Sequence, residues 1–158
     1  MDTVVKVQGF FRVNVVDPDG TLKGDSGWQE NKVVNEGFNH YLVELMLAQA
    51  NSLRVSHIAL GTSATAVADT DTALAGELEK RQAVTASSIA SKTAQFVATF
   101  ASTLSFVTDA TRQLNNIGLF AYSSKGSGSM FAGNTFSSSQ IASNQNVNVT
   151  YQIRFATA

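Results

Sequence analysis

Alternating hydrophobic and polar positions near both ends of the chain indicate strands with one buried and one solvent-facing side. Residues 3–16 place valine or phenylalanine at nearly every second position, and residues 147–155 do the same with Val, Tyr, Ile and Phe. This period of two is the spacing of side chains on one face of a strand. Asp17-Pro18-Asp19-Gly20 follows the first run. Pro presets one turn dihedral and Gly tolerates a positive φ, so we expect the chain to reverse there and to add a second strand within 21–34.

Residues 35–50 follow a different period. Apolar side chains recur there at steps of three and four residues, which places them in one stripe along a helix. Asn35 is a suitable N-cap, and Glu36 suits the positive end of the helix dipole. We predict one amphipathic helix over 35–50 that lies across an open sheet face and covers it. The stripe consists of Phe38, Tyr41, Leu42, Leu45, Met46 and Gln49.

The remainder of the chain has the pattern of short strands joined by polar loops. Residues 63–72 are small and polar and predict an exposed loop, whereas 72–81 fits either a helical turn or an extended arm. A Gly/Ser-rich link at 123–129 between two apolar runs predicts a hairpin. The predicted strands span 54–60, 82–91, 93–100, 117–122, 130–136 and 147–155.

At least seven short strands, one helix and no βαβ alternation predict a mainly β fold class. We expect an antiparallel β-sandwich or jelly-roll-like domain with one amphipathic α-helix. The prediction is a single β-rich domain over 1–158. It consists of an N-terminal hairpin or arm (1–34), the helix (35–50) and the main β-sandwich (54–158).

Charge is sparse in this chain. Its 158 residues include 11 Lys+Arg and 12 Asp+Glu, or 15%, with a net charge of -1, against about 25% charged residues in an average domain. This balance gives no electrostatic basis for binding nucleic acid, and no run approaches the roughly 20 apolar residues that cross a bilayer. We therefore expect neither nucleic acid nor membrane as a partner. A surface with little charge to desolvate favours packing against other subunits; a plain polar soluble domain is the alternative.

Two further features bear on the compartment. Cysteine is absent, which excludes disulfides and cysteine-ligated metals. The first six residues lack the basic head and apolar run of a signal peptide. We expect synthesis in a reducing cytosol.

Candidate chemical groups have simpler structural explanations. His40 and His57 lack partners at ligand spacing, and Asp17–Gly20 falls short of a Ca²⁺ loop. Gly126-Ser127-Gly128 lacks the ending and the helix of a phosphate-binding loop. We expect no catalytic residue, cofactor or metal ion. The aspartates considered as Ca²⁺ ligands, Asp17, Asp19, Asp69, Asp71 and Asp109, are better explained by turns.

Residues 58–155 contain a series of short motifs. Ile58-Ala59-Leu60-Gly61-Thr62 is followed by Asp71-Thr72-Ala73-Leu74, by Glu77 or Glu79, and by Arg81. These motifs resemble those of small virion proteins of tailed bacteriophages, a family whose pattern is an apolar strand with Leu-Gly-Thr-Gly, a Thr/Ala-rich loop, Asp-Thr-Ala-Leu, a Glu and an Arg. Ile117-Gly118-Leu119-Phe120, Met130-Phe131-Ala132 and residues 147–155 are similar to later strands of the family. Ser63, Asn116 and Gly133 stand where Gly, Glu and Arg are usual.

The resemblance implies a non-enzymatic virion structural protein on the capsid exterior, assembled in the host cytoplasm. It first implies a capsid decoration (cement) protein, a homotrimer that binds the major capsid protein and stabilises the shell. A tail or fibre-adaptor protein is the alternative within the same family. From another class, a carbohydrate-binding β-sandwich module would use exposed aromatics, for which Trp28, Tyr122 and Tyr151 are the candidates.

The expected contact elements are the N-terminal strand (4–11), the loop 63–72 and the tip 123–129. In these elements Gly61 would permit a bend, Asp71 would accept backbone N–H groups of the following turn, and Leu74 would anchor the loop. Arg81 would clamp Glu77 of the same chain or a carboxylate of a partner. The candidate interaction residues are Val5, Val7, Phe11, Gly61, Thr62, Asp69, Asp71, Leu74, Arg81 and Lys125.

Overall fold

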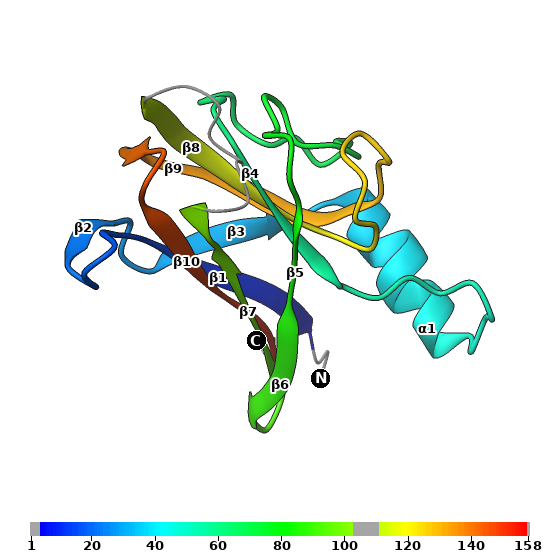
Figure 1. Cartoon of the computed structure of the whole chain (residues 1–158). Coiled ribbons are helices and arrows are strands. Elements are labelled where there is room, and N and C mark those ends of the chain that lie inside the picture. Colours follow the sequence, from blue (N-terminus) through cyan, green and yellow to red (C-terminus); the bar gives the residue numbers. More distant parts are fainter. Residues whose placement is uncertain (1–3, 103–110, 158) are drawn as a thin grey trace.

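A computed structural model describes residues 4–102 and 111–157 of the chain, as antiparallel strands with one short helical segment (Figure 1). The alternating runs at the two ends pair with each other. β1 (Val5–Val16) lies antiparallel to β10 (Asn146–Thr157) along its whole length. The other strands are β2 (Leu22–Asp25), β3 (Gln29–Val33), β4 (His57–Gly61), β5 (Gln82–Ala83), β6 (Thr85–Ala90), β7 (Thr93–Phe100), β8 (Thr111–Phe120) and β9 (Met130–Ala142).

These strands form one sheet that folds back on itself. Its order is β5-β4-β8-β9-β3-β1-β10-β7-β6, with β2 beside β1. β3 joins the two halves on one side, because residues 29–31 pair with β1 and residues 32–33 pair with β9. On the other side β5 pairs with β4, and β6, one residue later, pairs with β7. The single strand predicted over 82–91 is therefore two strands, and the sheet is nearly closed. The predicted mainly β, antiparallel sandwich-like class is confirmed.

Burial confirms the alternation predicted for β1 and β10. Phe11, Val13 and Val15 are fully buried, and so are Val149 and Tyr151 on the partner strand. The Phe11 ring stacks on the Tyr151 ring with centroids 5.8 Å apart. The apolar faces of both sheet halves meet in this core, and removal of that surface from water is the main force that holds them together.

The predicted N-terminal reversal is present, but the strand after it is interrupted. The N–H of Gly20, which has a φ of +89°, donates to the carbonyl of Asp17 at 2.9 Å. β2 and β3 both pair with β1, and between them Gly27 has a φ of +65°. Only glycine adopts that conformation without strain, so the chain bends there and β3 crosses toward β9.

The helical segment is shorter than predicted, and it does not lie across a sheet face as expected. It covers residues 35–46 as a π-helical stretch, η1 (Gly37–Val43), and one α-helical turn, α1 (Glu44–Met46). Asn35 lies inside the helix, so it is not the N-cap, and no side-chain cap bond precedes η1. The helix projects from one end of the sheet instead of covering a face (Figure 1). The reason is that the two sheet halves already cover each other's apolar faces.

Candidate functional site

Two of the three predicted contact elements meet in one surface. The N–H of Met130 donates to the carbonyl of Thr72 at 3.0 Å, and Lys125 Nζ lies 2.6 Å from Glu79 Oε1. These contacts join residues 62–80 to residues 121–129, and we name the joined loops the loop platform. Residues 72–81, for which the sequence fitted either a helical turn or an extended arm, are irregular, with one isolated β-bridge from Glu77 to Gly61.

A buried ion pair fixes the loop platform. Arg81 binds Glu77 through two contacts, Nε to Oε1 at 2.5 Å and Nη2 to Oε2 at 3.1 Å, and both side chains are almost fully buried. Arg81 Nη1 also donates to the Tyr122 carbonyl at 2.9 Å and to Ser127 Oγ at 3.1 Å. Its guanidinium carbon lies 3.6 Å from the centre of the Phe120 ring. The sequence left open whether Arg81 binds Glu77 of its own chain or a carboxylate of a partner. The structure shows the pair with Glu77.

The platform is also held from below by apolar anchors. Leu74, as expected, is buried, and so is Val67. Both pack in a cluster with Val34, Ala59, Phe120 and Met130. The long loop is thus fastened at two apolar points and one ionic point, which restricts its conformations before any partner binds.

Two expectations within this loop need correction. Gly61 lies in β4 and makes no bend; a Cβ there would come 2.2 Å from Asn116 Oδ1 and 3.0 Å from the Ala75 carbonyl, so it is a point of close approach. Asp71 accepts the N–H of Ala68, at 2.9 Å, and that residue precedes Asp71. The Asp71 side chain therefore stabilises the turn over residues 68–71 that precedes it.

The outer surface of the platform is made mostly of small side chains, with Tyr122 and Lys80 as larger exposed exceptions. Asp69 pairs with Lys32 at 3.1 Å, and Glu79 pairs with Lys125. Small residues lose little conformational freedom when covered, and paired charges present a weaker field. The exposed positions include Ala64, Thr65, Ala66, Ala68, Thr70, Thr72, Ala73, Ser123 and Ser124.

The third predicted contact element, the N-terminal strand, pairs with β10, and β10 contributes Ile153 and Phe155 to the lining of an apolar groove. Near this end β1 pairs with β10 alone, since β3 leaves it after Asn31 to join β9. The two halves diverge there and leave a groove of about 750 Å³ beside the helix. Its walls include Leu42, Leu45, Leu53, Val55, Phe96 and Phe155.

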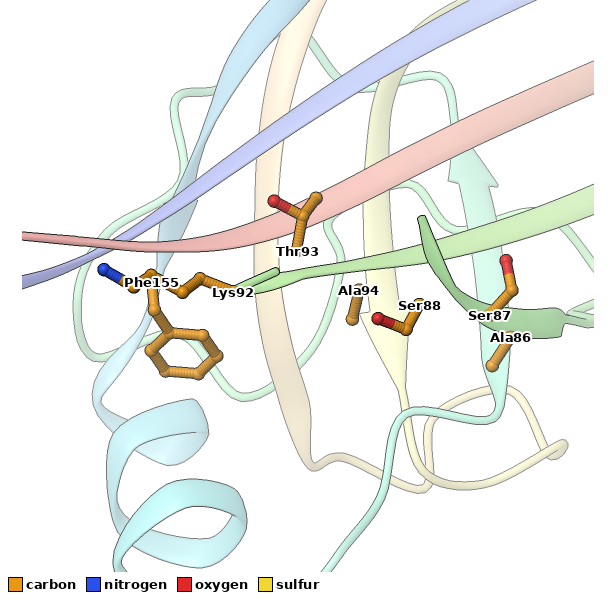
Figure 2. Close-up of a pocket in the computed structure, with 7 residues that line it drawn as sticks. All are labelled: Ala86, Ser87, Ser88, Lys92, Thr93, Ala94 and Phe155. Atoms are coloured by element: carbon orange, nitrogen blue, oxygen red, sulfur yellow. The ribbon is translucent and has the colours of Figure 1, made fainter. Parts of the chain in front are cut away.

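A second hollow, of about 500 Å³, extends this groove along the hairpin of β6 and β7. Ala86, Ala94 and Phe155 line both hollows, so they are continuous. Figure 2 shows Phe155 and Ala94 pointing to one side of the strands and Thr93 to the other. The charged residues among the linings are Arg54 and Lys92, both basic.

The helix beside the groove leaves much apolar surface uncovered. Only Tyr41 of its predicted stripe is buried, while Leu45, Met46 and Leu47 are 64%, 84% and 64% exposed. Phe38 and Val43 are also exposed. The sequence analysis missed this surface, although three consecutive apolar residues carried the signal: successive helical positions are about 100° apart, so one face cannot bury all three.

The histidines have ordinary surroundings. His40 is exposed between Glu44, with Nδ1 2.6 Å from its Oε1, and Glu36 at 3.8 Å; the hydrogen bond to Glu44 and then the charge of Glu36 raise the pKa of His40. Burial, with a smaller effect from Arg81, lowers the pKa of His57. Within residues 4–102 and 111–157 no three His, Asp or Glu side chains gather as metal ligands, and no helix is long and apolar enough to span a membrane. Asp109 lies outside these ranges.

The candidate interaction residues are divided between surface and interior. Val5, Asp69 and Lys125 are exposed, and Val7, Thr62 and Asp71 are partly covered. Phe11, Gly61, Leu74 and Arg81 are buried within the chain. Tyr151, a candidate for sugar contact, is also fully buried, and its hydroxyl accepts a hydrogen bond from the Asn31 amide. It therefore cannot share an exposed aromatic face with Trp28 and Tyr122.

Comparison with known proteins adds no relative: the chain matches no family model, no curated protein and no solved structure.

Proposed function

We propose that this chain is a non-enzymatic structural protein of a phage virion. Its role is that of a capsid decoration (cement) protein on the outside of the shell. The observation that supports this is the loop platform. Its long irregular loop is held by the buried Arg81–Glu77 pair and presents mostly small side chains, with Asp69 and Glu79 paired to lysines.

Such a surface suits adhesion to a large, pre-formed assembly. The ordering of the loop is completed within the chain, so little conformational freedom remains to be lost on binding. Asp69 and Glu79 already have cationic partners, so few isolated charges lose water at an interface. In this proposal the platform contacts the major capsid protein, and several copies act together as a homotrimer.

Substitutions on the platform surface test the role. Deleting 63–72 would remove the buried Val67, so point variants are preferable. Thr65→Glu and Ala66→Glu place charge at exposed positions. Both are expected to leave folding unchanged and to prevent binding to phage particles prepared without the protein. Ser143→Glu, on an exposed turn between β9 and β10, is the control. Saturation of particles by both platform variants would contradict the choice of surface.

The copy number in purified particles tests the role itself. A decoration protein is present in many copies over the shell, and a stained gel or cryo-electron microscopy of the particle counts them. A few copies at one vertex or along the tail would favour the tail or fibre-adaptor alternative. Absence of the chain from purified particles would refute a virion role.

A further inference from the structure

The exposed apolar side chains of the helix adjoin the groove, and we call the two together the apolar patch. Leu45 belongs to both, because it lines the groove and still exposes 64% of its surface. The patch has a protruding part, the end of the helix with Met46 and Leu47, and a hollow part of about 750 Å³. A surface with both parts is self-complementary in shape. The loop platform supplies no residue to the lining of this groove.

The exposed apolar area of the helix region is near the upper end of what a lone subunit leaves bare. Five large apolar side chains of the helix region are between 41% and 84% exposed. Side chains of this size present on the order of 500 Å² together, near the top of the range for the largest patch on a monomer. A standard interface buries about 800 Å² on each partner. The groove walls, including Leu53, Val55 and Phe155, supply the remaining area.

Charge identifies the kind of occupant. Arg54 lines the groove and makes no ion pair within the described ranges, and Lys92, which lines the second hollow, makes none there either. The helix carries the opposite sign: Glu36 and Glu44 flank its exposed face, with only the exposed His40 between them. An occupant that combines exposed apolar side chains with carboxylates fits this basic-rimmed groove, and the helix of the chain itself has that composition.

We propose that the end of the helix from a second copy of this chain occupies the groove. Met46 and Leu47 of one copy fill the apolar hollow of the other, and Glu44 of the first lies against Arg54 of the second. The contact removes from water the apolar surface that the fold leaves uncovered. This proposal deepens the proposed function, on which it rests for the meaning of the assembly, but the contact itself is independent of any virion.

Sedimentation of the full chain over a range of concentrations tests the contact. The wild type is expected to sediment as an oligomer and Met46→Glu as a monomer. At concentrations too low for the wild type to associate, the two urea midpoints should agree, because an 84% exposed side chain contributes little to the fold. The matched control is Leu22→Glu, a 53% exposed leucine on β2 outside the patch, which should associate as the wild type does. Equal loss of association in both variants would refute the assignment.

A charge exchange tests the orientation. Arg54→Glu and Glu44→Arg are each expected to raise the dissociation constant about tenfold or more, and the double exchange to restore it. Failure of the double variant to recover overturns the Glu44–Arg54 contact.

A wild type that stays monomeric throughout overturns the whole proposal. If an apolar dye then binds the groove of that monomer and Phe155→Asp abolishes the binding, the groove belongs to a small amphiphile. A monomer that is nevertheless abundant in particles refutes this contact and leaves the proposed function standing. A wild type that is an oligomer but is absent from particles supports this contact and refutes the proposed function.

Discussion

Removal of the Arg81 guanidinium is expected to destabilise the chain strongly. In Arg81→Met the stem still packs near Phe120, but the Glu77 carboxylate stays buried without its cation and the Tyr122 carbonyl loses a donor. Breaking a buried ion pair on one side costs about 3–5 kcal/mol, and an unsatisfied carbonyl adds about 1 kcal/mol. We expect a loss of at least about 4 kcal/mol in the free energy of unfolding, the lower end of that sum.

Urea unfolding followed by circular dichroism measures this loss. With a denaturant slope of about 2 kcal/mol/M, the midpoint should fall by about 2 M. Lys125→Met is the matched control. The Lys125–Glu79 pair is as short, at 2.6 Å, and lies in the same platform, but its side chains are 41% and 65% exposed. Exposed pairs contribute less than about 1 kcal/mol, so the control midpoint should hardly move.

A double variant separates the stranded charge from lost packing. Arg81→Met with Glu77→Leu buries no charge and should recover most of the loss, since apolar replacement of a buried pair is often neutral. The reasoning is refuted if Arg81→Met costs no more than Lys125→Met. It is also refuted if the double variant is as unstable as the single one, because the buried carboxylate would then not be the cause.

Two further substitutions probe the helix. Gly37→Ala should lower the urea midpoint although alanine favours helices by about 1 kcal/mol, because the new Cβ would lie 2.2 Å from the Phe131 carbonyl oxygen; a rise in the midpoint would contradict the close contact. The raised pKa of His40 means that its contribution is complete below the unfolded-state value near 6.5 and is lost as the pH rises through the higher folded-state value. The urea midpoint of the wild type should therefore fall more between pH 6 and pH 8 than that of His40→Gln, and parallel profiles would argue against it.

The strands could be predicted because their signal is local. In the middle of β1 and β10 every second side chain enters the same core, so Val13 and Val149 reveal the buried face from the sequence alone. The turn at Asp17–Gly20 is equally local, as its carbonyl and N–H groups lie three residues apart. The crossing of β3 from β1 to β9 is different. It depends on which strands lie on either side of β3. The glycine at position 27 indicates a bend but not the strand toward which the chain turns.

The position of the helix could not be predicted from its apolar stripe. We expected the stripe to cover a sheet face, but the apolar faces of the two sheet halves cover each other. Tyr41 does pack inward, edge-on to Phe131 with centroids 5.1 Å apart. The next turns extend past the end of the sheet, where Leu45 and Met46 remain 64% and 84% exposed. Local periodicity gives the stripe but not the place where the sheet stops. The groove could not be predicted for the same reason, since its lining comes from the helix, residues 52–56 and strands that lie far apart in the sequence.

The candidate site residues were predicted in part. Leu74 and the carboxylate partner of Arg81 follow from residue type, because a loop needs an apolar anchor and a buried guanidinium needs an anion. Whether that anion came from the same chain depended on the fold of residues 72–81, which has no regular period. The identification of Gly61 as a bend failed because its neighbour Asn116 approaches from another strand.

The two proposed surfaces depend on each other energetically. The loop platform costs little to cover, but its exposed side chains are small and offer few of the large anchors that dominate tight interfaces. One platform alone would hold a shell weakly. The helix and groove offer the large apolar contact that the platform lacks. Joining copies through that contact presents several platforms at once, and each bound platform then raises the effective concentration of the others. Met46→Glu should therefore weaken particle binding as well, although Met46 lies outside the loop platform.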